Sequence, residues 1–257
     1  MTVQGTGVTP EQREQFERDG FLIVTDPGYP ESALEGAPKD VEGLYTKFPE
    51  EYEDENKVFH TWHRILDAWK ISDNVKTIAL NPRMHAILES LYGRKPLPFQ
   101  TLNFPFGTNQ KAHSDTIHFN SKPPGFMCGV WVAFEDIDMD NGPLFYYPGS
   151  HKLPEVTMQE VGTIADHSHY DEYEAYIGKV IEEHGLEPRY GLVKKGQAII
   201  WSANILHGGF QQKDMERSRH SQVTHFYFEG CKYYTPLLSK DPNKEDETFW
   251  RDPDWIS

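Results

Sequence analysis

One stretch of the chain reads Lys111-Ala112-His113-Ser114-Asp115-Thr116-Ile117-His118-Phe119. We expect a β-strand here, on which the side chains of His113 and Asp115, two residues apart, point to the same face. A later apolar run, residues 199–206, is followed by His207. Two histidines and one carboxylate with open coordination positions form the facial triad of non-haem Fe(II) oxygenases. The two segments therefore predict an iron site, provided that they face one cavity.

A His-x-Asp pair alone is weak evidence for a metal in a chain that contains 12 histidines. A second such pair, His169 and Asp171, lies in a polar stretch before an expected helix, and a surface position is the simpler interpretation there. His113 on its own is equally consistent with a histidine of the core. The metal site is favoured by Gly208 and Gly209, because glycines after His207 let a ligand or the backbone approach closely.

Two arginines near the start of the last expected strand also favour this site. Arg217 and Arg219 each have the planar side chain that binds a carboxylate through two parallel hydrogen bonds. Arg219 and Ser221 are two residues apart, so they share a face of that strand.

The composition excludes several classes of protein. The chain has 257 residues and a formal net charge of −15, which suits one large domain and disfavours nucleic acid and anionic membranes as partners. Cys128 and Cys231 lie in apolar runs and predict buried thiols without a disulfide framework. No apolar run reaches the roughly 18 residues of a membrane helix, and the N-terminus resembles no secretory signal. A cytoplasmic protein is expected, and the oligomeric state stays open.

The N-terminal part of the chain, about residues 1–96, is expected to be mainly helical. Thr9, Pro10 and Gln12 mark the start of a helix that ends near Gly20. A short buried strand follows over residues 21–24. We expect loop and short helix over residues 28–57, and helices over residues 62–69, 72–80 and 81–93.

The pattern then becomes mainly β and predicts a barrel over about residues 97–235, with the flanking helices packed on it. The candidate strands cover residues 99–106, 112–119, 127–134, 144–147, 191–193, 197–202 and 221–229. An insertion, about residues 152–190, carries a helix over residues 173–184. This insertion is either a pocket lid, with Tyr170, Tyr173 and Tyr176 reaching inward, or a surface helix. A Pro- and Asp-rich tail, residues 236–257, ends what we expect to be a single domain.

In their order along the chain, these motifs resemble the phytanoyl-CoA dioxygenase (PhyH) family of Fe(II)/2-oxoglutarate-dependent oxygenases. The resemblance covers nearly the whole chain, and the ordered set is more specific than any member. The segments that carry it are residues 14–21, His113-Ser114-Asp115, Trp131 within residues 129–133, residues 141–144, residues 148–152, Gly196, His207-Gly208-Gly209 and Arg219-x-Ser221.

The resemblance implies a double-stranded β-helix, a jelly-roll or cupin-like barrel, in which His113, Asp115 and His207 bind Fe(II). The implied reaction consumes 2-oxoglutarate and O2 and releases succinate and CO2 while a C–H bond of the substrate is oxidised. Related halogenases have a small residue in place of the carboxylate. Asp115 therefore implies hydroxylation or a related oxidation.

The resemblance also implies a site for the co-substrate. Arg219 matches the position that pairs with the distal carboxylate of 2-oxoglutarate, and Ser221 adds a hydrogen bond; Arg217 is the alternative anchor. Trp131 matches an aromatic residue beside the co-substrate, although packing in the barrel explains it equally well.

The substrate is expected to be a small polar or natural-product-like metabolite, because the chain lacks the dense basic patch that suits a CoA ester. The candidate pocket residues are His118, Phe119, Asn120, Tyr146 and Trp201, for each of which packing is an equal explanation. Three alternatives remain. They are another oxidation at the same iron (demethylation, desaturation or ring formation), a cupin-like metal-dependent isomerase or hydrolase, and a non-catalytic binding domain.

Overall fold

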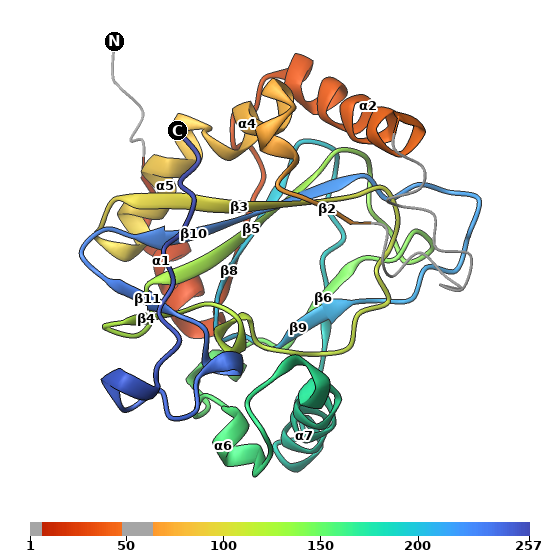
Figure 1. Ribbon diagram of the computed structural model, residues 1–257. Helices are drawn as coiled ribbons and strands as arrows, with labels where there is room; N and C mark the ends of the chain where they lie inside the picture. The colour runs from red at the N-terminus through yellow and green to blue at the C-terminus, as the bar shows by residue number, and fades with distance from the viewer. Residues whose placement is uncertain (1–6, 48–63) are drawn as a thin grey trace.

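Two antiparallel β-sheets face each other in the computed structural model, which describes residues 7–47 and 64–257 (Figure 1). The strands are β1 (Phe21–Val24), β2 (Ile65–Leu66), β3 (Pro96–Phe104), β4 (Asn120–Lys122), β5 (Met127–Ala133), β6 (Leu144–Tyr146), β7 (Arg189–Tyr190), β8 (Ala198–Ser202), β9 (His207–Gly209), β10 (Ser221–Phe228) and β11 (Lys232–Tyr234). The larger sheet has the order β1-β8-β5-β10-β3-β2 and the smaller one β7-β6-β9, while β11 pairs with β4. This arrangement confirms the expected jelly-roll barrel.

Helices flank the barrel on two sides. They are α1 (Pro10–Asp19), α2 (Glu31–Lys47), α4 (Asp73–Ala79), α5 (Pro82–Tyr92), α6 (Met158–Val161) and α7 (Tyr170–Glu183). Figure 1 shows α2, α4 and α5 along the larger sheet and α6 and α7 beyond β6 and β9. The predicted start of α1 is confirmed, because Thr9 and Gln12 form a reciprocal capping box.

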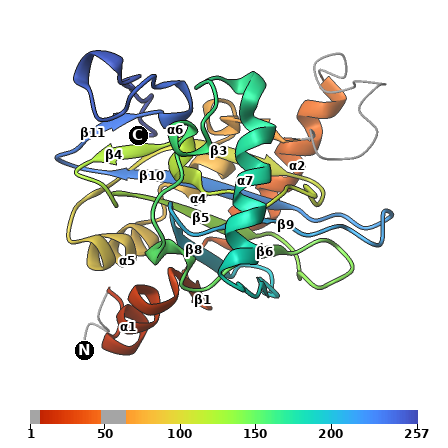
Figure 2. The ribbon, with the colours of Figure 1, turned by 90° about the horizontal axis from the view of Figure 1, so that it is seen from below.

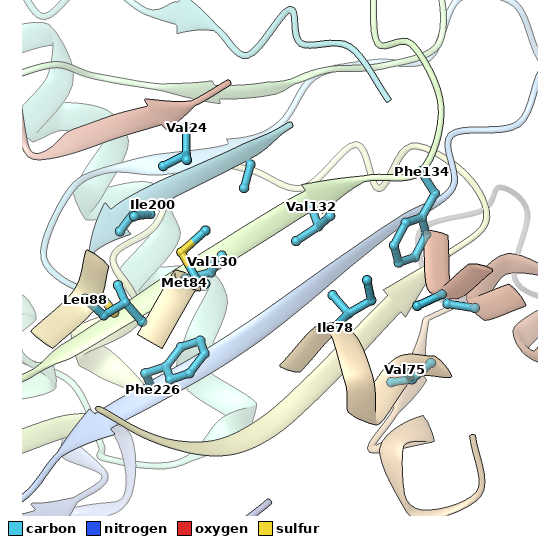
Figure 3. Packing of buried hydrophobic residues seen from close by; sticks show 14 of the residues in the cluster. Val24, Val75, Ile78, Met84, Leu88, Val130, Val132, Phe134, Ile200 and Phe226 are labelled. Atoms are coloured by element: carbon cyan, nitrogen blue, oxygen red, sulfur yellow. The ribbon is translucent and has the colours of Figure 1, made fainter. Parts of the chain in front are cut away.

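One face of the larger sheet is buried against α4 and α5 (Figure 3). Val130 and Val132 on β5 point to this face, as does Ile200 on β8, and Met84 and Leu88 on α5 pack against it. Alternation along β5 turns the residues between them, including Trp131, to the other face, where they line the barrel interior. Every residue of β5 is buried, so this strand separates the helical core from the barrel interior.

Truncation of Leu88 tests this helical core. Its side chain is 0 % exposed, and we expect Leu88→Ala to lower the free energy of unfolding by about 2–5 kcal/mol, because the cavity that it leaves cannot close fully. Leu192→Ala is the matched control: Leu192 is 53 % exposed, and its truncation should change stability by less than about 0.5 kcal/mol. Denaturant unfolding measures both, and equal losses would contradict the assigned core.

The interior of the barrel is lined from β10. Directly paired residues of an antiparallel ladder project to the same face. Val223 on β10 is the partner of Trp131 on β5, and both belong to the interior cluster. Ser221 and His225, two residues to either side of Val223, therefore point into the same interior.

The N-terminal region contributes more than helices. β1 pairs with β8 at one edge of the larger sheet, and β2 pairs with β3 at the other edge. Both edge strands of the larger sheet therefore come from the part of the chain before residue 97.

Apart from the segment of residues 112–119, three expectations of secondary structure are wrong in the described residues. Residues 28–47 hold one long helix, α2, in place of loop and short helix; residues 48–57 lie outside the described range. The helix expected from residue 62 is replaced by β2 and a 3-10 turn, η2 (Ala68–Lys70), because Asp67 has a left-handed backbone with a φ of 53°; residues 62–63 also lie outside that range. The strand expected over residues 191–193 is found at β7 instead.

The insertion and the C-terminal segment both pack on the barrel. Figure 2 shows α7 lying across the sheets. Tyr173 and Ile177 of α7 form a buried cluster with Ile117 and Leu206. At the other end of the chain, Ile256 is buried, and its N–H donates to the Pro98 carbonyl of β3 over 2.9 Å.

The two cysteines differ in burial. Cys128 is a buried thiol, as expected, whereas Cys231 is only half-buried; both are free. Within residues 7–47 and 64–257, we find no helix with the length and apolarity needed to cross a membrane.

Candidate metal centre

His113 and Asp115 do not lie on a strand, contrary to the expectation for residues 112–119. His113 forms an isolated antiparallel bridge with His207, whose N–H groups and carbonyls exchange hydrogen bonds of 2.9 and 3.0 Å. Asp115 then begins a 3-10 turn, η3 (Asp115–Ile117). Ser114 caps this turn by accepting from the Thr116 N–H, and such local hydrogen bonds compete with a strand ladder.

The three expected ligands nevertheless meet. Their ligand atoms on His113, Asp115 and His207 all lie within 4.8 Å of one another, and all three side chains are buried. The Nε2 atoms of His113 and His207 are 3.6 and 3.7 Å from the same oxygen, Asp115 Oδ1.

The backbone orients both imidazoles. The Nδ1 atom of His113 is 3.0 Å from the Lys111 carbonyl oxygen, and that of His207 is 3.1 Å from the Ile205 carbonyl oxygen. A proton on each Nδ1 satisfies these carbonyls and leaves each Nε2 unprotonated, which is the usual arrangement for a histidine that binds metal. The Gln110 amide nitrogen lies 3.3 Å from His113 Nε2. Burial lowers the pKa of His207 to about 4, so this imidazole is neutral at pH 7, as a ligand must be.

The two oxygens of Asp115 have different surroundings. Oδ1 faces the two imidazoles, whereas Oδ2 accepts a 2.8 Å hydrogen bond from Trp201 Nε1 and lies 3.7 Å from His225 Nε2. Burial raises the pKa of the Asp115 carboxyl, but its interactions with the His207, His113 and His225 side chains outweigh burial and hold the pKa below its usual range. The group is therefore a carboxylate with one oxygen available to a cation.

Trp201 was expected to line the substrate pocket, but its indole is instead hydrogen-bonded to Asp115. Gly129, its partner on β5, makes room for the ring: a Cβ at this position would lie 2.3 Å from Trp201.

Removal of this hydrogen bond tests whether it orients Asp115. We expect Trp201→Phe to weaken Fe(II) binding about 10- to 100-fold, the usual cost of losing a partner of a metal ligand. Anaerobic Fe(II) titration measures the affinity, and Trp255→Phe, at an indole 37 % exposed, is the control. Unchanged affinity in Trp201→Phe would show that Asp115 is held by other contacts.

A group of buried donors lies beside Trp131. Arg219 is 2 % exposed, and its Nη2 donates to the Phe106 carbonyl over 3.0 Å. In the described part of the chain no partner exists for Arg219 Nε, Ser221 Oγ or Trp131 Nε1, all of which are buried. The guanidinium carbon lies 5.6 Å from the ring centroids of both Phe104 and Trp131. Unsatisfied buried donors on a cation are costly, and a bound carboxylate satisfies them, so these residues fit the distal group of 2-oxoglutarate.

Arg217, the alternative anchor, is engaged elsewhere. Its Nη1 lies 2.9 Å from Asp138 Oδ2 in an ion pair at the surface, with 35 % of its side chain exposed. Arg219, by contrast, is buried, and burial lowers its pKa to about 10. Its guanidinium is still charged at neutral pH.

The other pocket candidates have different surroundings. The His118 ring lies 5.1 Å from that of Tyr170, and burial lowers its pKa to about 3. Phe119 lies 5.1 Å from His225. Asn120 donates to Glu155 over 2.7 Å. Tyr146 packs on Phe21 at 4.1 Å and belongs to the interior core.

Sequence reasoning missed His225. The available signal was the spacing along the last strand. His225 lies four residues after Ser221, so both side chains face the barrel interior. His225 Nδ1 lies 2.9 Å from Gln100 Oε1, so the ring is fixed from the neighbouring strand. Tyr173, which had been considered for a lid, instead accepts a hydrogen bond from the Ser114 N–H and supports the ligand loop.

The rival pair at residues 169 and 171 forms no such centre. His169 Nδ1 lies 2.6 Å from Asp166 Oδ1, and Asp171 is exposed. In the described residues the metal-competent group is the one at residues 113, 115 and 207.

Comparisons with known proteins identify the family. Residues 16–221 match the family model described as phytanoyl-CoA dioxygenase (PhyH). The chain is 23 % identical to human peroxisomal phytanoyl-CoA dioxygenase, over 96 % of this chain and 76 % of that protein. It is 30 % identical to mouse phytanoyl-CoA dioxygenase domain-containing protein 1 over 37 % of this chain, and the match spans about a third (32 %) of that relative.

Solved structures share the fold. The non-haem alpha ketoglutarate dependent carbocyclase SnoK superposes with a TM-score of 0.70 at 16 % identity, over 88 % of this chain and 86 % of SnoK. The epimerase SnoN, in complex with Fe3+, alpha ketoglutarate and nogalamycin RO, gives 0.65 at 17 % identity, over 96 % and 98 %. EctD from S. alaskensis with 2-oxoglutarate and 5-hydroxyectoine gives 0.63 at 17 % identity, over 92 % and 82 %.

Proposed function

We propose, because the chain belongs to the phytanoyl-CoA dioxygenase (PhyH) family, that it is an Fe(II)/2-oxoglutarate-dependent dioxygenase whose iron is held by His113, Asp115 and His207. One observation carries the proposal: three buried ligand atoms lie within 4.8 Å of one another, and both imidazole Nε2 atoms face one carboxylate oxygen. Two histidines and a carboxylate leave the coordination positions that this chemistry requires.

The chain's own residues position the reactants. Fe(II) and 2-oxoglutarate, when bound, supply the oxidising chemistry with O2, and succinate and CO2 are released. Arg219 binds the distal carboxylate of the co-substrate, and Ser221 donates a hydrogen bond to it. Trp131 closes one side of this subsite with its ring. Trp201 holds Asp115 from behind, so that the carboxylate keeps one oxygen toward the metal. The buried interior excludes water, which strengthens each of these electrostatic contacts.

The substrate reaction that we propose is hydroxylation of a C–H bond in a small polar or natural-product-like metabolite. Asp115 supplies the third ligand, which supports hydroxylation over halogenation. Demethylation, desaturation and ring formation use the same iron site and remain the alternative reactions. The similar structures include a carbocyclase and an epimerase, so these alternatives belong to the test.

Anaerobic titration of the protein with Fe(II) and 2-oxoglutarate tests the class of enzyme. We expect a weak visible charge-transfer band to develop and to saturate. Its absence at saturating reagents would remove the proposed function and leave a cupin-like isomerase, a hydrolase or a binding domain. Screening a metabolite library for substrate-stimulated succinate release, with mass spectrometry of the products, then separates hydroxylation (a gain of one oxygen) from desaturation or ring formation (a loss of two hydrogens).

A further inference from the structure

The C-terminal segment places an arginine next to the aromatic wall of the barrel. Trp250 bridges Tyr234 on β11, and the Arg251 N–H donates to the Tyr233 carbonyl over 2.8 Å. This pairing sets Arg251 opposite Tyr233 and on the same face. Tyr233 itself is buried, and its ring stacks on that of Tyr227 at 4.1 Å. Arg251 lies beyond residues 16–221, the range that matches the family model.

The guanidinium of Arg251 has one edge in use and one edge free. Nη1 donates to Thr235 Oγ1 over 3.0 Å, and the guanidinium carbon lies 4.8 Å from the Phe119 ring centroid. Nε is buried without a hydrogen-bond partner in the described residues. The Nε and Nη2 protons of an arginine point in parallel, which is the geometry that takes both oxygens of a carboxylate.

A second unpartnered donor lies close by. Tyr227 is 0 % exposed, its ring is stacked between Phe99 at 4.2 Å and Tyr233 at 4.1 Å, and its buried hydroxyl has no partner among the residues described. Tyr233, which lies opposite Arg251, stacks on Tyr227, and the Phe119 ring that Arg251 contacts lies 5.3 Å from Phe99, the other ring stacked on Tyr227. The two unsatisfied buried donors thus belong to one aromatic cluster, and leaving both without an acceptor is costly.

This pair is connected to the metal centre by aromatic rings. Phe119 contacts Arg251 on one side and lies 5.1 Å from His225 on another. His225 Nε2 is 3.7 Å from Asp115 Oδ2. Phe119 therefore joins Arg251 to the residue that contacts the Asp115 carboxylate.

We infer that the substrate is a carboxylic acid whose carboxylate is bound by the Nε–Nη2 edge of Arg251 and the hydroxyl of Tyr227, with its reacting carbon directed past Phe119 to the iron. The inference rests on the proposed function and adds the chemical class of its substrate. In a chain of net charge −15, an anion needs such a local cationic site. Arg251 also borders a surface cavity of about 430 Å³, whose lining includes Asp252 and the ion pair of Lys232 with Glu245.

Paired compounds test the inference on the Fe(II)-loaded enzyme at saturating 2-oxoglutarate. The probes are small aliphatic and aromatic carboxylic acids, each beside its primary amide, and the readout is the concentration that half-maximally stimulates succinate release. We expect acids to stimulate, with amides at least about 10-fold weaker, because the amide lacks the charge. Arg251→Gln should raise the half-saturating concentration of the acids about 10-fold or more and leave that of the amides unchanged.

Three further variants sharpen the test. Arg251→Lys keeps the charge without the fork and should give an intermediate shift. Tyr227→Phe keeps the stacked ring and should raise the half-saturating concentration of the acids about 3- to 10-fold. It decides the matter if Arg251→Gln does not fold. Arg83→Gln, at an exposed arginine paired with Asp26, is the control and should match the wild type.

The outcomes separate this inference from the proposed function. Amides that stimulate as well as acids, no stimulation by any acid in an enzyme that turns over 2-oxoglutarate, or unchanged values in Arg251→Gln and Tyr227→Phe would overturn the inference alone. A wild-type protein with neither the charge-transfer band nor 2-oxoglutarate turnover would overturn the proposed function instead.

Discussion

His207→Ala should abolish succinate formation and weaken Fe(II) binding by more than about 100-fold. Losing a residue that only hydrogen-bonds to a metal ligand already costs about 10- to 100-fold in affinity, and this variant removes a ligand itself. The alanine removes one of the two imidazoles that face Asp115 Oδ1. It keeps the backbone bridge to His113, because that bridge is made by N–H and carbonyl groups. The barrel should therefore fold, and the loss should lie in metal binding. Anaerobic titration for the charge-transfer band and a succinate assay measure the two effects.

His169→Ala is the matched control for this experiment. His169 belongs to the other His-x-Asp pair of the chain, and its imidazole contacts Asp166 at the surface. Its removal should leave both the band and succinate formation at the wild-type level. Near wild-type activity in His207→Ala, or an equal loss in His169→Ala, would remove His207 from the proposed triad.

The sequence predicted the meeting of these ligands although it mispredicted their local structure. A two-residue spacing was expected to align His113 and Asp115 on a strand, whereas Ser114 turns the chain into η3. The ligands converge because His113 pairs with His207 across the barrel. That bridge joins residues far apart in the sequence, so the hydrophobic periodicity of either segment alone cannot predict it.

The residues that contact the metal ligands were harder to predict from the sequence, because they too depend on contacts between distant segments. The bond from Trp201 to Asp115 depends on the space that Gly129 leaves on the neighbouring strand. His225 was within reach, because strand alternation from Ser221 gives its direction. Arg251 was not, because the Pro- and Asp-rich composition of residues 236–257 predicts an irregular tail. Contacts with distant segments, such as the Tyr234–Trp250 bridge and the Ile256–Pro98 hydrogen bond, return this tail to the barrel.

Arg219→Ala should raise the 2-oxoglutarate concentration for half-maximal activity about 100-fold or more. Arg219 is 2 % exposed, with an unpartnered Nε beside the unpartnered hydroxyl of Ser221. Removing one member of a buried charge pair costs about 3–5 kcal/mol, and each 1.4 kcal/mol is about tenfold in affinity. The measurement is succinate release as a function of 2-oxoglutarate, with Fe(II) affinity determined separately as evidence that the site is otherwise intact.

Two further substitutions identify the anchor. Arg219→Lys retains the charge but not the parallel donors, so its half-saturating concentration should fall between those of the wild type and Arg219→Ala. Arg217→Ala breaks an ion pair with Asp138 at the surface, where such pairs contribute about 0–1 kcal/mol, and it should leave the co-substrate requirement unchanged. If Arg217→Ala raises that requirement while Arg219→Ala does not, the co-substrate is bound through Arg217, and the buried donors around Trp131 serve another ligand. We expect Arg219 to be the anchor, because it is buried in the barrel interior. A carboxylate bound beside Arg217 at the surface cannot satisfy the buried donors around Trp131.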